Sequence, residues 1–521
     1  MLRSDRSRQS LLLVAVVFAV LVLSGFTAAV IAQPAIQQNL RLPESDTHYR
    51  AVKDWIEEVP QADYPHPSAK AYEAFRDIKY GVRIHWGIYS IWAQGNESWP
   101  MLRLPFDKKQ EYQELYKTWN PNGFDAEQWM KLFKDNGLQM FAFTAKHHEG
   151  FSMFDTKTRV KERINWTAPG GPRIEQCDLA YSIMETPLHR DVVKELCDAG
   201  RKYGLKIDLY FSHPDWYDAD FRPYGWHPAL TQDALAHPDL YGKALITSRT
   251  QLYAMTPDVT AEEEARMLAR HRAQLVELLS NYGPIDMMCL DNWFGPRVWP
   301  QTRETIKLIR KIQPDVMLRA RGIGNYGDYY TPEGFVPGNK ENTDMPWFVI
   351  YPLGSVFSYD ADATKYKGGQ WIIRNLVDSV AKGGRFMVGI GPDVNGRFHP
   401  KAIEQLEQAG TWLKTNGPSI YGSVARPEQD WQEGETIRFT TTKDGQTIHA
   451  ICLEWPGKRL ALKTVRPKQG SKISLLGYDQ PLAWTYSAQN GLVIELPDQS
   501  PFPAGSPLAF AYALRIEPAV P

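Results

Sequence analysis

The sequence predicts an α/β fold, a (β/α)8-like barrel of the TIM type followed by a C-terminal antiparallel β-sandwich domain. Two observations support this prediction. In the larger part of the chain, an amphipathic helix, a glycine-containing turn and an apolar strand recur in that order. After Tyr421-Gly422, short apolar runs alternate with turns rich in Gly, Asp and Pro, and no helix pattern intervenes. We therefore expect a barrel domain at 45–422 and a β-sandwich domain at 426–521.

The barrel units can be placed one by one along the chain. The first strand is expected at 80–86 (YGVRIHW). Each later unit is expected as a helix followed by a strand. The expected helices are 126–136, 189–203, 261–282, 302–312 and 370–382. The strands that follow them, in the same order, are 138–145, 205–211, 285–291, 316–322 and 385–391. We expect an irregular or missing unit between Gly322 and Gly368. A doubly wound open sheet is the alternative, but no glycine-rich dinucleotide-binding turn supports it.

The C-terminal runs predict strands of a compact sandwich. They read TIRFTTT, TIHAICLEW, KISLLGY, GLVIEL and PLAFAYALRI. Three tryptophans of this region, Trp431, Trp455 and Trp484, either bind carbohydrate or belong to the domain core, and we favour the core. A long segment at 216–260, rich in Pro and aromatic residues, predicts an elaborate loop over the barrel mouth.

The N-terminus predicts export of the protein. Arginines within the first eight residues precede an apolar run at 11–23, and small residues then lead to a plausible cleavage site after Ala32. We expect a signal peptide at 1–32 and a periplasmic or extracellular protein. An uncleaved membrane anchor is the alternative, because the apolar stretch approaches the length that spans a bilayer.

Composition excludes some classes of function. Lys and Arg number 59 against 60 Asp and Glu, and no segment concentrates basic residues, so nucleic acid is not an expected partner. The four cysteines could form disulfides in an exported protein, but their spacings match no metal site. We expect Cys289 to be a free thiol in the core, and we expect no metal or cofactor. The oligomeric state stays open, a homo-oligomer included.

Two adjacent histidines, His147 and His148, follow the strand expected at 138–145. Side chains alternate in direction along a strand, so at most one of them could be an ordinary core histidine. Barrel folds place their chemistry at the carboxyl ends of the strands. Other polar and aromatic residues hold the same position after other strands: His85 with Trp86, Tyr210 to His213, Asp291 to Trp293, and Arg319 to Arg321. Together they predict a polar pocket that binds a carbohydrate.

Asp291 is the most informative single residue of this set, although it could also be a helix-capping or barrel-stabilising aspartate. As the nucleophile of a retaining glycosidase it needs a second carboxyl group roughly 5–5.5 Å away. Glu333 in the loop after the next strand offers that group, unless it is an ordinary solvated glutamate. The competing acids are Asp328 and Glu341, with Glu97 and Glu149 as further carboxylates near the mouth.

Five segments carry a resemblance to a known family. They are YGVRIHWGIYSIWAQGNESW, FTAKHHEGFSMFDT, DMMCLDNWF, GDYYTPE and RFMVGIGPDVNGRFHPKAIEQLEQAGTWLKTNGPSIYG. In this order they resemble the signatures of the glycoside hydrolase family 29 α-L-fucosidases over about residues 70–422. The resemblance implies a (β/α) barrel with a C-terminal β-sandwich, and hydrolysis of α-L-fucosides with retained stereochemistry and without a metal. The implied partner is a fucose-containing oligosaccharide or glycan, with membrane contact only if the N-terminal segment is uncleaved.

The resemblance also assigns roles to residues. Asp291 would be the nucleophile and Glu333 the acid/base. The expected substrate-binding residues are His85, Glu97, Trp99, His147, His148, Tyr210, Trp293 and Arg321.

This sequence departs from the family pattern at four positions. Glu149 replaces the usual Asp after the two histidines, Ser98 separates Glu97 from its Trp, Cys289 replaces an aromatic residue, and Asn292 replaces a small one. These departures keep two alternatives open: the same mechanism on α-L-galactose and the same mechanism on a sulfated fucose. A catalytically silent fucose-binding protein is a third alternative, because family membership does not establish turnover.

Overall fold

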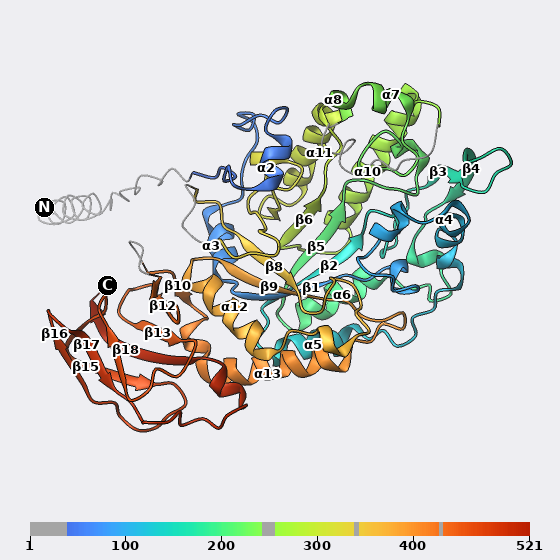
Figure 1. The fold of residues 1–521 in the computed structure, drawn as a ribbon. Coiled ribbons are helices and arrows are strands. Elements are labelled where there is room, and N and C mark those ends of the chain that lie inside the picture. Colours follow the sequence, from blue (N-terminus) through green and yellow to red (C-terminus); the bar gives the residue numbers. More distant parts are fainter. Residues whose placement is uncertain (1–38, 242–255, 338–342, 427–430, 521) are drawn as a thin grey trace, which may run out of the picture. The chain divides into compact units, whose positions relative to one another are not determined.

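The computed structural model describes residues 39–241, 256–337, 343–426 and 431–520 (Figure 1). The predicted signal peptide lies outside these residues. Seven strands form a parallel sheet in the order β7-β6-β5-β2-β1-β9-β8. Their bounds are β1 Tyr80–Ile84, β2 Met140–Lys146, β5 Lys206–Ser212, β6 Met287–Asp291, β7 Met317–Leu318, β8 Phe348–Pro352 and β9 Arg385–Ile390.

A short irregular segment, 329–333, connects the two edge strands of this sheet. Tyr329 forms a parallel bridge with Arg319 next to β7, and Tyr330 forms one with Trp347 next to β8. Glu333 bridges Ile350 within β8. The segment therefore takes the place of an eighth strand between β7 and β8, and the predicted (β/α)8-like barrel is confirmed. The irregular unit lies between Gly322 and Gly368, as expected.

Helices lie around the outside of the parallel strands (Figure 1). They are α5 Ala126–Asp135, α6 Val192–Lys202, α10 Ala261–Ser280, α11 Trp299–Ile312, α12 Gly369–Ala381 and α13 Pro400–Asn416. Local sequence sets their ends: Thr260 and Glu263 form a capping box at the start of α10. Gly137, just after α5, has φ 81°, a left-handed conformation that favours glycine.

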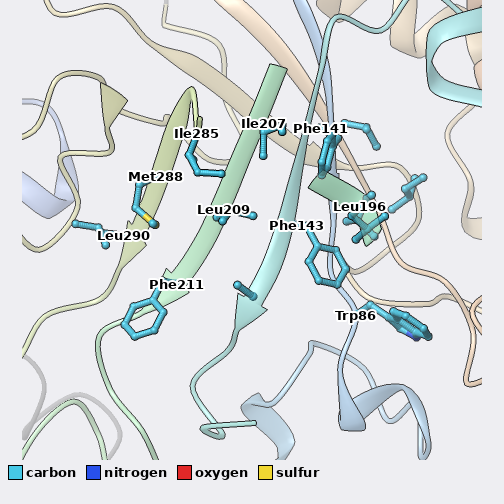
Figure 2. Packing of buried hydrophobic residues seen from close by; sticks show 14 of the residues in the cluster. Trp86, Phe141, Phe143, Leu196, Ile207, Leu209, Phe211, Ile285, Met288 and Leu290 are labelled. Carbon is cyan, nitrogen blue, oxygen red and sulfur yellow. The ribbon is translucent and has the colours of Figure 1, made fainter. Parts of the chain in front are cut away.

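Alternation along each strand separates the outer face of the barrel from its interior. Ile207, Leu209 and Phe211 of β5 belong to the large cluster between the strands and the helices (Figure 2). The intervening Asp208 and Tyr210 face the barrel interior instead, where they approach Tyr329 and Asp291. One strand thus supplies both the core and the polar interior.

The barrel interior is layered from one end of the strands to the other. At the N-terminal ends, an apolar cluster is closed from below by α3 (Ala69–Asp77) and includes Phe75, Met140, Met287, Met317 and Met387. The next layer is polar: the buried Arg83 and Arg319 both donate hydrogen bonds to Cys289 Sγ. Cys289 is a free buried thiol, as predicted.

Several elements near the mouth of the barrel were not predicted. After β2 the chain forms an antiparallel hairpin of β3 (Val160–Asn165) and β4 (Arg173–Leu179). The segment expected to be an elaborate loop contains α7 (Gln232–Ala236) and α8 (Pro238–Tyr241) in its described part. No helix among the described residues is both long enough and apolar enough to cross a membrane.

The C-terminal region forms antiparallel sheets, as predicted. The larger sheet contains β10 Ser423–Val424, β11 Gln432–Glu433, β12 Ile437–Thr442, β13 Ile448–Cys452, β15 Arg466–Leu475 and β18 Tyr512–Val520, and the smaller one β14 Arg459–Leu462, β16 Trp484–Ser487 and β17 Gly491–Glu495. Trp455 and Trp484 pack against the core of this domain, whereas Trp431 lies beneath the cations of Lys382 and Arg438.

Candidate active site

A cavity of 1330 Å³ opens at the carboxyl ends of the barrel strands. All the site residues expected from the sequence line it: His85, Glu97, Trp99, His147, His148, Tyr210, Asp291, Trp293, Arg321 and Glu333. The strands bring these residues together because parallel strands end at the same face of a barrel.

Asp291, the last residue of β6, lies at the bottom of this cavity and is only 8% exposed. Its Oδ2 accepts a hydrogen bond of 2.6 Å from the Tyr210 hydroxyl. Its Oδ1 accepts one of 2.9 Å from Arg321 Nη1. Both oxygens are therefore held in place, and the carboxylate is fixed in orientation.

The electrostatic surroundings keep Asp291 ionised. Burial by itself raises the pKa of this carboxyl group, but the nearby guanidinium groups of Arg321 and Arg319 oppose that effect. His148 and the Tyr210 hydrogen bond act in the same direction as the arginines. The net result is a pKa well below the ordinary value of an aspartate, so the group is available as an anion.

Arg321 also contacts Glu333, the second expected acid. Its Nη2 lies 3.0 Å from Glu333 Oε2, while Nη1 contacts Asp291. The two nitrogens belong to one rigid planar fork, so the two carboxylate oxygens that Arg321 contacts lie within about 8 Å of each other. The Glu333 side chain is 47% exposed, against 12% for Asp291. Glu333 therefore lies on the solvent side of the pair.

Two of the other acids considered from the sequence, Asp328 and Glu149, do not line this cavity. Asp328 is buried in an ion pair with Arg310 and a 2.8 Å contact with His66. Glu149 is buried behind His147, with its Oε2 at 3.6 Å from that ring's Nδ1. Glu341 lies outside the described residues.

Rings from three strand ends form a compact pocket beside Asp291. The ring of His147 stacks on Tyr210 with centroids 5.4 Å apart, and His85 meets both rings at 5.8 Å. Ser98 Oγ lies 2.6 Å from His147 Nδ1 and fixes its orientation. Burial, with Arg83 nearby, lowers the pKa of His85 well below its ordinary value. A neutral imidazole can both donate and accept, as recognition of sugar hydroxyls requires.

Glu97 is positioned by a set of hydrogen bonds that we call the Ser358 clamp. Ser358 N donates to Glu97 Oε1 at 2.9 Å, and Ser358 Oγ donates to Gly95 O at 2.7 Å. Glu97 itself has a positive φ of 34°, a strained conformation for a glutamate. Burial raises the pKa of Glu97 to about 7, although His147 and the Ser358 N–H lower it in part.

One side of the cavity is formed by successive aromatic rings, here called the aromatic wall: His148, Trp99, Trp226, Trp293 and His48. Neighbouring ring centroids in this series lie 4.7, 5.5, 5.8 and 6.1 Å apart. The wall includes Trp99, so the inserted Ser98 does not remove that ring from the site. Each ring offers an apolar face with a polar edge, which suits a sugar.

Sequence reasoning missed some lining residues, notably His48, Trp226 and Phe357. Trp226 falls in the segment that was expected to cover the mouth, and its aromatic character was the only available signal. Phe357 packs on His85 at 5.3 Å, where Gly389 leaves room for it: a Cβ on that glycine would lie 2.4 Å from the Phe357 ring. Neither contact can be read from local sequence.

Two of the sequence departures have a structural reason. Asn292 has φ 65°, a left-handed conformation that Asn adopts more readily than most residues other than Gly. Its carbonyl oxygen would lie 1.9 Å from a Cβ at Gly322, so the chains approach closely here. Cys289 is absent from the cavity lining and lies below it, with the two arginines described above.

Among the described residues, one group of carboxylates comes close enough together to hold a cation: Glu162, Asp220 and Glu263. Arg266 pairs with the first two of them, and Arg222 pairs with Glu263. All three carboxylates are therefore already paired with arginine side chains, which offset most of their charge.

Two family models match the chain. A model described as α-L-fucosidase matches residues 57–418, which is well over half of the chain. A model described as the α-L-fucosidase C-terminal domain matches residues 429–517.

Similar proteins agree with these matches. Tissue α-L-fucosidase of Homo sapiens is 27% identical over 87% of this chain and 91% of its own length. Plasma α-L-fucosidase of Homo sapiens is 25% identical over 81% of this chain and 85% of its own length. Among solved structures, α-L-fucosidase isoenzyme 1 from Paenibacillus thiaminolyticus matches with a TM-score of 0.66 at 24% identity, over 87% of this chain and 99% of that one. A family 29 α-L-fucosidase from Bacteroides thetaiotaomicron, trapped as a covalent intermediate, matches with a TM-score of 0.67 at 22% identity, over 88% of this chain and 99% of that one.

Proposed function

The chain belongs to the α-L-fucosidase family, and on this premise we propose that it is an exported, retaining exo-glycosidase that releases terminal α-L-fucose from fucosylated glycans. The observation that carries the proposal is the bridge made by Arg321 between Asp291 and Glu333 inside one cavity. A retaining glycosidase needs two carboxyl groups flanking one glycosidic bond.

The first chemical step uses the two carboxyl groups in different roles. The ionised Asp291 attacks the anomeric carbon while the bond to the leaving oxygen breaks, and Glu333 gives its proton to that oxygen. The product is a glycosyl ester on Asp291. Glu333 is then ionised, and its contact with Arg321 stabilises the negative charge.

The second step restores the enzyme. Glu333 removes a proton from a water molecule, whose oxygen attacks the anomeric carbon and displaces Asp291 as a carboxylate. Tyr210 and Arg321 hydrogen-bond Asp291 throughout, and so keep it aligned for both displacements. Two inversions at one carbon give a sugar of retained configuration.

An assay of the purified protein tests this function. We expect it to hydrolyse 4-nitrophenyl α-L-fucoside faster than the β-fucoside or the α-L-galactoside, with the α-anomer of fucose as the first product in an NMR time course. Initial release of the β-anomer would contradict the retaining mechanism. Preference for the galactoside would replace the proposed glycone, and binding of fucose without turnover would favour a silent binding protein.

Export is supported by the arginine-rich start, the apolar run at 11–23 and the small residues that end at Ala32. We expect the mature protein to begin at Gln33 and to be found in the periplasm or medium. N-terminal sequencing of the protein purified from each fraction checks this. An intact N-terminus in the membrane fraction would favour the membrane anchor.

The oligomeric state is a separate question. Size-exclusion chromatography with light scattering would determine whether the protein forms a homo-oligomer.

A further inference from the structure

His48 lines the catalytic cavity although it comes from outside the barrel. It lies in α2 (Thr47–Val52), ahead of β1 and ahead of residue 57, where the match to the family model begins. Its imidazole makes no hydrogen bond with any described residue and is in edge contact with Trp293, with centroids 6.1 Å apart. The side chain thus presents unused donor and acceptor capacity to the cavity.

The segment that carries His48 is firmly anchored. Asp46 caps α2, because its Oδ1 accepts hydrogen bonds from His48 N at 2.8 Å and from Tyr49 N at 3.0 Å. Leu42 N donates to Asn325 Oδ1 at 2.9 Å, and the side chain of Val52 is 1% exposed in the core. His48 is therefore held in one position rather than carried on a free N-terminal arm.

His48 lines the same cavity as the two catalytic carboxyl groups. Burial, followed by the positive charges of Arg321 and Arg319, lowers its pKa well below the ordinary value, while Asp291 acts in the opposite direction. The imidazole is neutral at neutral pH and can bond a hydroxyl group in either sense. Arg321 joins Asp291 to Glu333 in that cavity, and the scissile bond of a bound substrate must lie between these two carboxyl groups.

The pocket for the fucose ring does not require His48. His85, His147 and Tyr210 already surround the space next to Asp291, and all three come from barrel strands or their ends. The cavity of 1330 Å³ is larger than the 300–1,000 Å³ that is usual for a drug-sized ligand, so a single monosaccharide leaves much of it unfilled. The part of the aromatic wall beyond His148 and Trp99, formed by Trp226, Trp293 and His48, also lines this cavity.

We propose that His48 is a substrate-contacting residue that, with Trp293 and Trp226, forms a subsite for the saccharide on the leaving-group side of the scissile bond. The imidazole hydrogen-bonds a hydroxyl group of that saccharide, and the tryptophan rings contact its apolar face. This inference rests on the proposed function. It extends that function from recognition of the fucose to recognition of the saccharide to which the fucose is linked. The substrate class is fucose linked to another sugar residue.

The test compares two substrates that share the fucosyl group. One is a fucosylated disaccharide with a hexose leaving group, and the other is α-L-fucosyl fluoride, whose leaving group has no hydroxyl. We expect His48→Ala to lower kcat/KM about tenfold for the disaccharide, as loss of one well-placed hydrogen bond does, and less than about twofold for the fluoride. His48→Asn, which keeps a donor and an acceptor, should recover part of the loss.

Matched controls distinguish the loss of a substrate contact from a defect in folding. Lys53→Ala changes an exposed residue directly after the same helix and should leave both rates unchanged. All variants should melt within about 2 °C of the wild type, because His48 makes no side-chain hydrogen bond. An equal loss of kcat/KM on both substrates, or no loss on either, would overturn the inference while leaving the proposed function intact. A wild type that releases fucose from neither substrate would overturn both.

Discussion

The two ends of the barrel differ in the kind of residues that line their cavities. At the carboxyl ends, the cavity of 1330 Å³ is lined by the charged groups of Asp291, Glu333 and Arg321. At the opposite ends, a second cavity of 780 Å³ has a mostly apolar lining, and Lys206 and Asp286 at its rim pair with each other at 2.8 Å. The same strands run between these ends. Each strand therefore contributes to the stability of the fold at its N-terminal end and to the catalytic site at its carboxyl end.

The difference predicts that mutations at the two ends have separable effects. Changes at the carboxyl ends should alter turnover far more than stability, since charged and strained groups there are kept for function. Changes at the other ends should alter the free energy of unfolding with little effect on turnover.

The largest expected effect is that of Asp291→Asn. An amide cannot act as the attacking anion, so kcat should fall on the order of 10⁴-fold or more. The melting temperature should fall by a few degrees, because the substitution leaves the charges of Arg319 and Arg321 without their anionic partner. Kinetics with 4-nitrophenyl α-L-fucoside and a thermal melt measure both quantities. Turnover close to that of the wild type would disprove the nucleophile assignment.

Glu333→Gln should have the next largest effect. Loss of the general acid should lower kcat/KM by about 10²–10⁴-fold for a disaccharide, whose leaving group needs a proton. The loss should be smaller for an aryl fucoside with a good leaving group, since that departure needs less protonation. Measuring both substrates side by side checks the role. Equal losses on both would speak against an acid.

Phe75→Ala tests the opposite end of the barrel. Phe75 is 2% exposed, lies in α3 and closes the apolar cluster against Tyr329 and Phe348. Removing its ring should lower the free energy of unfolding by about 3–5 kcal/mol. Urea denaturation measures this loss, and kcat of the folded fraction at 25 °C should change less than about twofold. A large fall in kcat at full folding would show that the two ends are not independent.

Glu97→Gln tests the carboxyl-end cavity through the pH dependence of the free energy of unfolding. The pKa of Glu97, raised by burial to about 7, exceeds the ordinary value of 4.5. The folded protein therefore holds this proton more tightly than the unfolded chain does. Its stabilising contribution is present below about pH 4.5 and is lost as pH rises through about 7.

The glutamine variant lacks this titration. Relative to the wild type, its free energy of unfolding should rise between pH 5 and pH 8 by up to about 3 kcal/mol. Denaturation curves of both proteins at the two pH values measure the difference. A difference that does not change with pH would mean that Glu97 does not titrate in this range.

Local patterns were sufficient to predict most of the barrel and its catalytic face. Strand alternation and helix stops placed the main β units, and their carboxyl ends pointed to Asp291 and the histidine pair. The segment 329–333 could not be predicted as an eighth strand, because isolated bridges rather than an apolar run connect it to its neighbours. The β3–β4 hairpin was missed because most residues of its strands are only partly buried and many are charged.

The missed site residues share one physical reason. His48 reaches the cavity from α2, which lies well ahead of β1, and Phe357 reaches it from the loop after β8. No periodicity marks either residue. Their places depend on long-range fits, such as the space above Gly389 and the hydrogen bond from Leu42 N to Asn325 Oδ1. Sequence predicts which strand ends contribute to a site, but it does not predict which distant loops complete it.

The Ser358 clamp has a consequence for the order in which the enzyme is assembled. It joins residues 261 positions apart, from the loop after β1 to the loop after β8. β1 also needs β9 beside it, since His85 N donates to Ile390 O. A growing chain that has not reached these residues holds both histidines and the nucleophile but lacks the finished sugar pocket. Activity should therefore emerge in one late event, when the last barrel units are added, and not gradually as the chain lengthens.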